Sequence, residues 1–236
     1  MNGWALTSSI VPGTAYFEEI WPVTEPLFAA YADKWEMEWR PHFATPQELA
    51  EFETSPAPQG TGAVYAGILH RWRHLTNYKG VVFLDSDAVI MDYTYDICRE
   101  VDEQVPMAAG GNFNGAVVVM RSCERTEMFL TLVWEQREKY RHYQWLEQAA
   151  MMELMGFDGN YPGDDLPSAF LGDTEWTPLW SQLSGRWNAH PMHPQEVQPL
   201  IFHPGGVQPF EKRLGMVLDA AQGILPAPWR NDLPRI

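Results

Sequence analysis

Two aspartates directly follow a short apolar run, and their spacing is the first sign of chemistry in this chain. Residues 81–84 are apolar, Asp85, Ser86 and Asp87 follow, and residues 88–90 are apolar again. Such a run predicts a strand buried on both faces, as in a parallel sheet. Carboxylates at its end are costly to bury without a neutralising partner. They predict a cation site at the edge of the sheet where ligands of open α/β sheets bind. The simpler interpretation is a solvated acidic turn.

A histidine far downstream could complete this site. His203 follows the apolar residues 199–202 and precedes Pro204 and Gly205. Two carboxylates and an imidazole suit Mn²⁺ or Mg²⁺. An ion held there would stabilise charge on a diphosphate leaving group, and it would let an acidic protein hold an anion. The alternative is a loop histidine that is hydrogen-bonded to the backbone.

Composition limits the classes of protein that fit. The chain has 236 residues, 45% of them hydrophobic, which predicts one globular domain with a large core. The net charge of -15 argues against nucleic acid as a partner. Cys98 and Cys123 form neither a disulfide framework nor a zinc motif, so we expect a reduced, cytoplasmic setting. No signal peptide and no run of ~18 apolar residues is found, so we expect no membrane span.

The order of the expected elements is that of an α/β fold. Strands are expected at 4–11, 34–40, 81–90, 105–109, 115–120 and 199–203, with one or two more between 176 and 187. Helices are expected at 62–78, at 126–140 with Thr126 as N-cap, at 144–155 and at 211–218, with two short helices in 14–32 interrupted by Pro22 and Pro26. Helices alternating with strands predict a mostly parallel central sheet flanked by helices.

The residues from 83 to 87 resemble the DxD motif of GT-A fold (Rossmann-like) nucleotide-sugar glycosyltransferases. Further elements resemble that family in the same order: a helix end at 75–78, an N-x-G strand at 112–119, an acidic-Gln helix start at 145–150, a Trp-Asn element at 186–188 and an H-x-G motif at 201–205. The pattern is most similar to galactomannan α-galactosyltransferases, xyloglucan xylosyltransferases and yeast α-1,6-mannosyltransferases. Glycogenin-like retaining enzymes come next.

This resemblance implies roles for particular residues. Asp85, Asp87 and His203 would bind the metal. Glu147 and Gln148 would act beneath the anomeric carbon of the transferred sugar. The residues expected to contact the donor are Ser8, Arg71, Asp85, Ser86, Asn114, Gly115 and Gly205.

The resemblance also implies an organisation of the single domain, 1–236. Residues 1–90 would bind the nucleotide, 91–206 the donor sugar and acceptor, and 207–236 would form a tail. The basic side of the pocket departs from the family pattern. Leu69 stands where a lysine or arginine is usual, with Arg71 and Arg73 close by. Val207 and Gln208 stand where a lysine often follows the H-x-G motif, and Lys212 comes several residues later. Arg71, Arg73 and Lys212 are therefore the candidates for the diphosphate.

The resemblance predicts a retaining, metal-dependent hexosyltransferase that uses a UDP-sugar and a glycan, protein or small-molecule acceptor. One alternative is a Mg²⁺-dependent phosphatase resembling the haloacid dehalogenases, with Asp85 as nucleophile, Asp87 as general acid/base, Lys139 as the required lysine and residues 163–165 as the last motif. Another is a non-catalytic carbohydrate-binding module that uses some of the 11 Trp.

Overall fold

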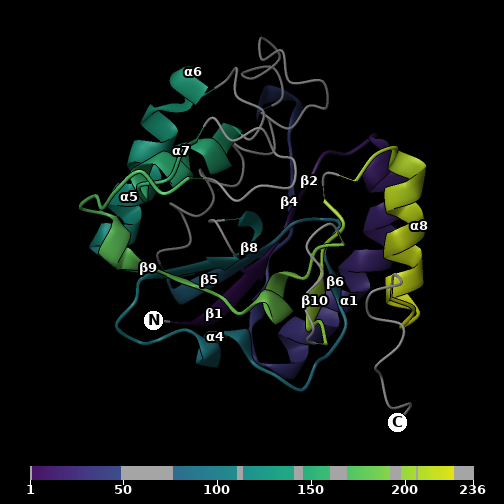
Figure 1. Ribbon diagram of the computed structural model, residues 1–236. Helices are drawn as coiled ribbons and strands as arrows, with labels where there is room; N and C mark the ends of the chain where they lie inside the picture. The colour runs from purple at the N-terminus through teal and green to yellow at the C-terminus, as the bar shows by residue number, and fades with distance from the viewer. Residues whose placement is uncertain are drawn as a thin grey trace.

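A six-stranded sheet in the order β3-β1-β5-β8-β7-β9 forms the centre of the fold (Figure 1). This computed structural model describes residues 2–48, 77–110, 114–140, 146–159, 169–191, 198–205 and 207–225. Strands β1 (Asn2–Thr7), β3 (Glu38–Trp39) and β5 (Tyr78–Leu84) run parallel. Strand β8 (Asn114–Arg121) is antiparallel to β5 and to β7 (Met107–Gly110), and β9 (Trp180–Gln182) is parallel to β7. The expected mostly parallel sheet with flanking helices is confirmed.

Alternate side chains of β5 enter two separate cores. Val81 and Phe83 lie in a core with residues of α5 (Glu124–Glu135), α6 (Arg137–Tyr140) and α7 (Leu146–Leu154). Val82 and Leu84 lie in a second core with α1 (Trp21–Lys34) and α4 (Ile97–Glu100). Successive side chains of a strand point to opposite faces, so an unbroken apolar run needs cover on both sides. Helices lie on both faces of the sheet and provide that cover (Figure 1).

A smaller core lies beside the end of the sheet that carries the acidic turn. Strand β6 (Val89–Ile90) pairs antiparallel with β10 (Ile201–Phe202). One buried residue of each strand, Val89 and Phe202, packs with α8 (Phe210–Ala221) and with the π-helical turn η1 (Tyr16–Ile20). A further two-stranded sheet joins β2 (Ser9–Ile10) to β4 (His42–Phe43). The short 3₁₀ turns are η3 (Thr177–Leu179) and η4 (Gly185–Asn188).

The expected helix 62–78 is wrong at its end. Tyr78 begins β5, so Lys79 and Gly80, which looked like a helix stop, lie inside a strand. A Cβ at position 80 would lie 2.3 Å from Cζ3 of Trp4 and 2.5 Å from the Met120 carbonyl oxygen. The glycine therefore permits close packing within the sheet, a need that local sequence does not reveal. Residues 62–76 lie outside the described part of the chain.

Three other local expectations are corrected. Pro26 does not break α1, which continues to Lys34 and buries residues such as Phe28; Pro22 is in the first turn, where a missing N–H costs nothing. The expected strand 34–40 shrinks to β3, because Glu36 adopts a φ of 55° in the turn after α1. Helix α5 starts at Glu124 with Cys123 as N-cap, so Thr126 lies inside the helix.

We predict that Gly80→Ala destabilises the protein by about 1–3 kcal/mol, because the added methyl group overpacks the site between Trp4 and Met120. Urea unfolding measures the change. Gly215→Ala is the matched control: Gly215 is exposed on α8, and a Cβ there meets nothing within 4 Å. That substitution should stabilise the helix by up to ~1 kcal/mol. If the two variants unfold at the same urea concentration, the close packing at Gly80 is contradicted.

Candidate functional site

Hydrogen bonds from neighbouring elements fix the acidic turn after β5. The Asp85 N–H donates to the Ala116 carbonyl on β8 (2.8 Å), and the Ala88 N–H donates to the Asp85 carbonyl across the turn (3.0 Å). The buried hydroxyl of Thr24, on α1, donates to the Ser86 carbonyl (2.7 Å). The turn is thus tied both to the sheet and to a helix. The two aspartate side chains therefore extend from a stretch of backbone that these hydrogen bonds hold in place.

The β6–β10 pair brings His203 to the same turn. Strand β6 begins two residues after Asp87, and β10 ends immediately before His203. The two strands pair with Phe202 opposite Val89. The His203 N–H also donates to the Ala189 carbonyl (2.9 Å). Short strands that contain no chemistry of their own therefore place the histidine beside the aspartates.

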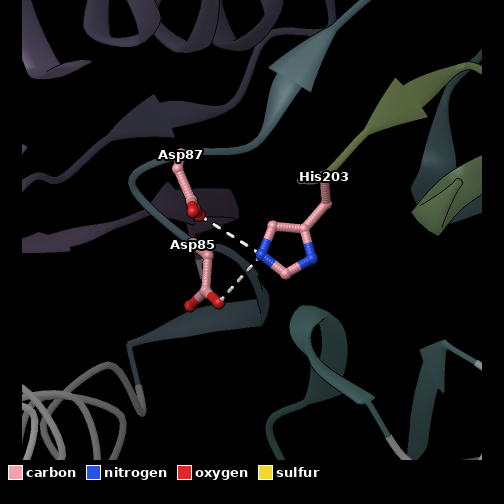
Figure 2. A group of neighbouring side chains, drawn as sticks. All are labelled: Asp85, Asp87 and His203. Carbon is pink, nitrogen blue, oxygen red and sulfur yellow. Dashed lines mark ion pairs between the residues drawn. The ribbon is translucent and has the colours of Figure 1, made fainter. Parts of the chain in front are cut away.

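Asp85, Asp87 and His203 form one cluster (Figure 2). Nε2 of His203 lies 3.2 Å from Oδ1 of Asp87 and 3.5 Å from Oδ2 of Asp85. One ligand atom from each residue lies within 4.8 Å of the others. Asp87 and His203 are buried, whereas the Asp85 side chain is 42% exposed. The cluster thus has two inner groups and one that faces outward.

The close charges of the cluster shift its pKa values. Although Asp85 is partly exposed, loss of solvent raises its pKa to about 7; His203 opposes this rise and Asp87 adds to it. Burial lowers the pKa of His203, but the charges of Asp87 and Asp85 outweigh burial and leave this pKa above its usual value. Crowded carboxylates favour a cation between them, whether that cation is an imidazolium or a metal ion.

The donor set fits a divalent metal ion. Two carboxylates and one imidazole are ligands that Mn²⁺ accepts. Both ring nitrogens of His203 are buried, and neither makes a hydrogen bond with the described residues. Gly205 leaves room for the ring, since a Cβ there would lie 2.2 Å from His203 Cε1 and Nε2. Nε2 faces the two carboxylates without a hydrogen bond, so it is placed to bind an ion together with them, which supports the metal interpretation.

Gln148 is connected to the acidic turn through the start of β8. Its Oε1 accepts a hydrogen bond from the Gly115 N–H (3.0 Å). The Asn114 side chain accepts one from the Ala116 N–H (2.9 Å), and the Ala116 carbonyl accepts from Asp85. Asn114 and Gly115, expected to contact the donor, and Gln148, expected beneath the anomeric carbon, are therefore linked to the acidic turn through β8.

Glu147 lies near enough to Asp85 to respond to its charge. Burial, together with the negative charge of Asp85, raises the pKa of Glu147 to about 8. The backbone N–H groups of residues 147 and 148, at the start of α7, oppose the increase. A carboxyl group with this pKa holds its proton at neutral pH and can donate a hydrogen bond.

Two further residues, Ser8 and Arg71, were expected to contact the donor. Ser8 is fully buried, and its hydroxyl has no hydrogen-bond partner among the described residues. The hydroxyl groups of the two adjacent residues both make hydrogen bonds. Thr7 donates to the Arg40 carbonyl, and Ser9 bonds with Nδ1 of His42 (2.6 Å). Of these three side chains, Ser8 alone lacks a partner in this part of the fold. Arg71, with Leu69 and Arg73, lies outside the described residues.

The Trp-Asn element supports the strand before His203. Trp187 is buried in the core shared with α1. The Leu200 N–H donates to the Arg186 carbonyl (2.7 Å). Asn188 packs over Gly110 at the end of β7, where a Cβ would lie 2.4 Å from Asn188 Nδ2. Residues 112, 113 and 145, which also supported the resemblance, lie outside the described residues.

The basic residue that contacts the cluster is one that the sequence analysis missed. Lys212 was a candidate, but it is exposed on α8. The next residue, Arg213, is buried, and its Nη1 lies 3.5 Å from Oδ2 of Asp87. The signal was present in the sequence, because Arg213 shares the buried face of an amphipathic helix with Val217 and Ala220. An arginine on such a face needs a buried partner.

No protein-family model and no curated protein sequence matches this chain. Its fold does match solved structures of glycosyltransferases. A glycosyltransferase involved in glycosylation of the major capsid of PBCV-1 superposes with a TM-score of 0.60 at 14% identity, covering 92% of this chain and 99% of that one. The galactosyltransferase LgtC, in complex with donor and acceptor sugar analogues, superposes with a TM-score of 0.51 at 15% identity, covering 97% of this chain and 100% of that one. The bifunctional glycosyltransferase WbbM superposes with a TM-score of 0.56 at 12% identity, covering 94% of this chain and 50% of that one.

These identities are low, so the matches concern the fold. They do not single out the galactomannan galactosyltransferase group that the sequence motifs resemble, and that finer relationship stays a prediction. The coarser expectation is confirmed: the chain has the GT-A-type fold found in glycosyltransferases.

Proposed function

We propose that this chain is a metal-dependent glycosyltransferase that transfers a sugar from a nucleotide diphosphate sugar. The observation that carries the proposal is the Asp85–Asp87–His203 cluster, at the end of a central strand in a fold shared with glycosyltransferases. Fold alone does not define activity, since one fold serves many functions. The chemistry of the cluster therefore carries the argument, and the fold gives its context.

Three residues of the cluster would bind the metal ion, and the surrounding backbone would hold them in position. Asp85, Asp87 and His203 would hold Mn²⁺ or Mg²⁺. When bound, the ion would supply charge stabilisation to the diphosphate leaving group. The backbone bonds of the turn and the β6–β10 pair keep these ligands in place before substrate arrives, which reduces the reorganisation needed for reaction.

Gln148 and Glu147 are proposed to act on the sugar. The Gly115 N–H holds the Gln148 side chain in a fixed position, which suits a group that orients the donor or stabilises developing positive charge. Glu147, protonated at neutral pH, would donate a hydrogen bond rather than act as a strong base. Transfer with retention of configuration by front-face attack requires no strong base, and both assignments agree with it.

The finer identity of the substrates remains part of the proposal. We infer a UDP-hexose donor, with Ser8 and Ser86 on the nucleotide side and Asn114, Gly115 and Gly205 on the side of the sugar and diphosphate. The acceptor class is open among glycans, proteins and small molecules. Cytoplasmic location stays a prediction, and the described helices include none long and apolar enough to cross a membrane.

The phosphatase alternative is less well supported. It requires a lysine beside Asp85, and Lys139 was the candidate. Lys139 instead lies on α6, where its Nζ donates to Glu153 on α7 (2.5 Å) and to the Tyr140 hydroxyl (2.8 Å). Residues 163–165, the other motif of that alternative, lie outside the described residues. No described contact favours the binding-module alternative over an enzyme.

A panel of nucleotide sugars with Mn²⁺ or EDTA tests the function. We expect at least one donor, UDP-linked, to give metal-dependent hydrolysis and a metal-dependent thermal shift, because a bound ligand stabilises the folded state. Asp87→Asn and His203→Ala should abolish the metal-dependent shift, since the first removes the negative charge of one ligand and the second removes the imidazole ligand. Glu103→Ala, which removes an exposed carboxylate, is the control and should behave as the wild type.

Three outcomes would overturn this proposal. The first is the absence of any metal-dependent response to every donor. The second is metal-dependent hydrolysis of an aryl phosphate without binding of a nucleotide sugar, which identifies a phosphatase. The third is tight glycan binding that Asp87→Asn leaves unchanged and no donor turnover, which identifies a binding module.

We predict that Gly205→Ala weakens Mn²⁺ binding by about tenfold or more, because the new methyl group displaces the His203 imidazole. Isothermal titration calorimetry with MnCl₂ measures the affinity. Gly215→Ala, further along the same stretch of chain, adds the same methyl group in open space and should bind Mn²⁺ normally. Unaltered binding by Gly205→Ala would show that His203 is not a ligand.

We predict that Gln148→Ala lowers kcat for donor hydrolysis by about a hundredfold while KM for the donor changes much less, as expected for a group that acts mainly in the transition state. Steady-state kinetics separates the two constants. Gln148→Met keeps the length of the side chain without its amide and should show the same loss. A change confined to KM would assign Gln148 to donor binding instead.

A further inference from the structure

Arg213 is a buried cation directly beside the acidic turn. It is 6% exposed, and its Nη1 lies 3.5 Å from Oδ2 of Asp87. Its Nε donates to the Val207 carbonyl (3.1 Å), in the loop that follows His203. In the part of the chain that the structure describes, Asp87 is the only carboxylate within ion-pair distance of this guanidinium. The arginine thus joins α8, the loop and the acidic turn.

Several contacts hold Arg213 in its position. Its guanidinium lies over the ring of Tyr16, 5.4 Å from the centroid, and that ring packs against Phe210 at a centroid distance of 5.2 Å. Cation–π contact of this kind adds to the ion pair where solvent is excluded. A buried guanidinium is stable only when it is paired. Arg213 and Asp87 therefore neutralise each other in the fold.

Asp87 divides its two oxygens between two partners. Oδ1 lies 3.2 Å from Nε2 of His203, and Oδ2 lies 3.5 Å from Nη1 of Arg213. A divalent cation bound to the cluster would draw on the same carboxylate charge. It would also add positive charge beside a carboxylate that already faces the guanidinium, and like charges repel. Arg213 and the metal ion therefore compete for Asp87.

We propose that Arg213 is an internal counter-ion that sets the affinity of the cluster for a free divalent cation. It stabilises Asp87 when no metal is bound and thereby weakens metal binding, because the ion gains less from a carboxylate that is already paired. This inference rests on the proposed function, since it takes the cluster to be a metal site. It assigns Arg213 a role in tuning the site, distinct from that of the ligands.

Titration of the protein with MnCl₂ alone, followed by calorimetry, tests this role. Arg213→Met removes the charge while keeping an unbranched apolar side chain. We expect it to bind Mn²⁺ at least about fivefold more tightly than the wild type, in line with usual coupling between sites. Arg213→Lys keeps the charge and should stay within about threefold of the wild type. Unchanged or weaker binding by Arg213→Met would overturn the proposal.

Arg99→Met is the control for net charge. Arg99 is 81% exposed and pairs with Asp96 (3.2 Å), so its removal changes the charge of the molecule by the same amount away from the cluster. It should bind Mn²⁺ as the wild type does. If it tightens binding as much as Arg213→Met, the effect is one of net charge and the counter-ion role fails.

A thermal measurement covers the case in which Arg213→Met is unstable. Without Arg213, Asp87 keeps only His203 as a cationic partner and gains more from a bound metal ion, so saturating Mn²⁺ should raise the Tm of Arg213→Met more than that of the wild type. An equal or smaller rise would count against the proposal. Absence of Mn²⁺ binding by the wild type would overturn the metal site itself, whereas equal binding by wild type and Arg213→Met would overturn the counter-ion alone.

Discussion

The burial of the Asp87 carboxylate is the constraint on which the site depends. A carboxylate that is 4% exposed requires positive charge around it, and two very different parts of the chain supply it. His203 arrives on β10, which pairs with the strand that follows Asp87. Arg213 arrives on α8, which packs over the same small core. The C-terminal third of the described chain thus completes an acidic turn made in the first half.

The sheet extends this constraint to the rest of the proposed pocket. Strand β8 lies antiparallel beside β5, so its first residues meet the acidic turn. Gly115 at that point holds Gln148 through its N–H, and α7 places Glu147 where it responds to Asp85. The proposed metal ligands and the proposed sugar-side residues therefore share one backbone framework. Under the proposed function, a cation bound at this cluster would let a molecule with a net charge of -15 hold an anionic donor.

Strong local patterns allowed much of the fold to be predicted from sequence. The apolar run 81–84 predicted a buried central strand, and its alternate side chains do enter two cores. The grouping of Asp85, Asp87 and His203 was predicted because each follows an apolar run that ends at a ligand-binding edge. Local reasoning failed at Gly80 and Pro26. The contacts of Gly80 with Trp4 and Met120, and the burial of α1, override the usual meaning of these residues.

The sequence by itself thus determined the residue types of the site, the order of the elements and the class of fold, since these depend on hydrophobic patterning and on donor chemistry. Only the tertiary structure decided that the buried cation of α8 faces Asp87. Lys212 and Arg213 are adjacent and alike in charge, but the rotation of α8 exposes the first and buries the second. Such a choice depends on which face of a helix meets the core. The partner of Arg213 is 126 residues away and comes from a different layer, so no local signal names it.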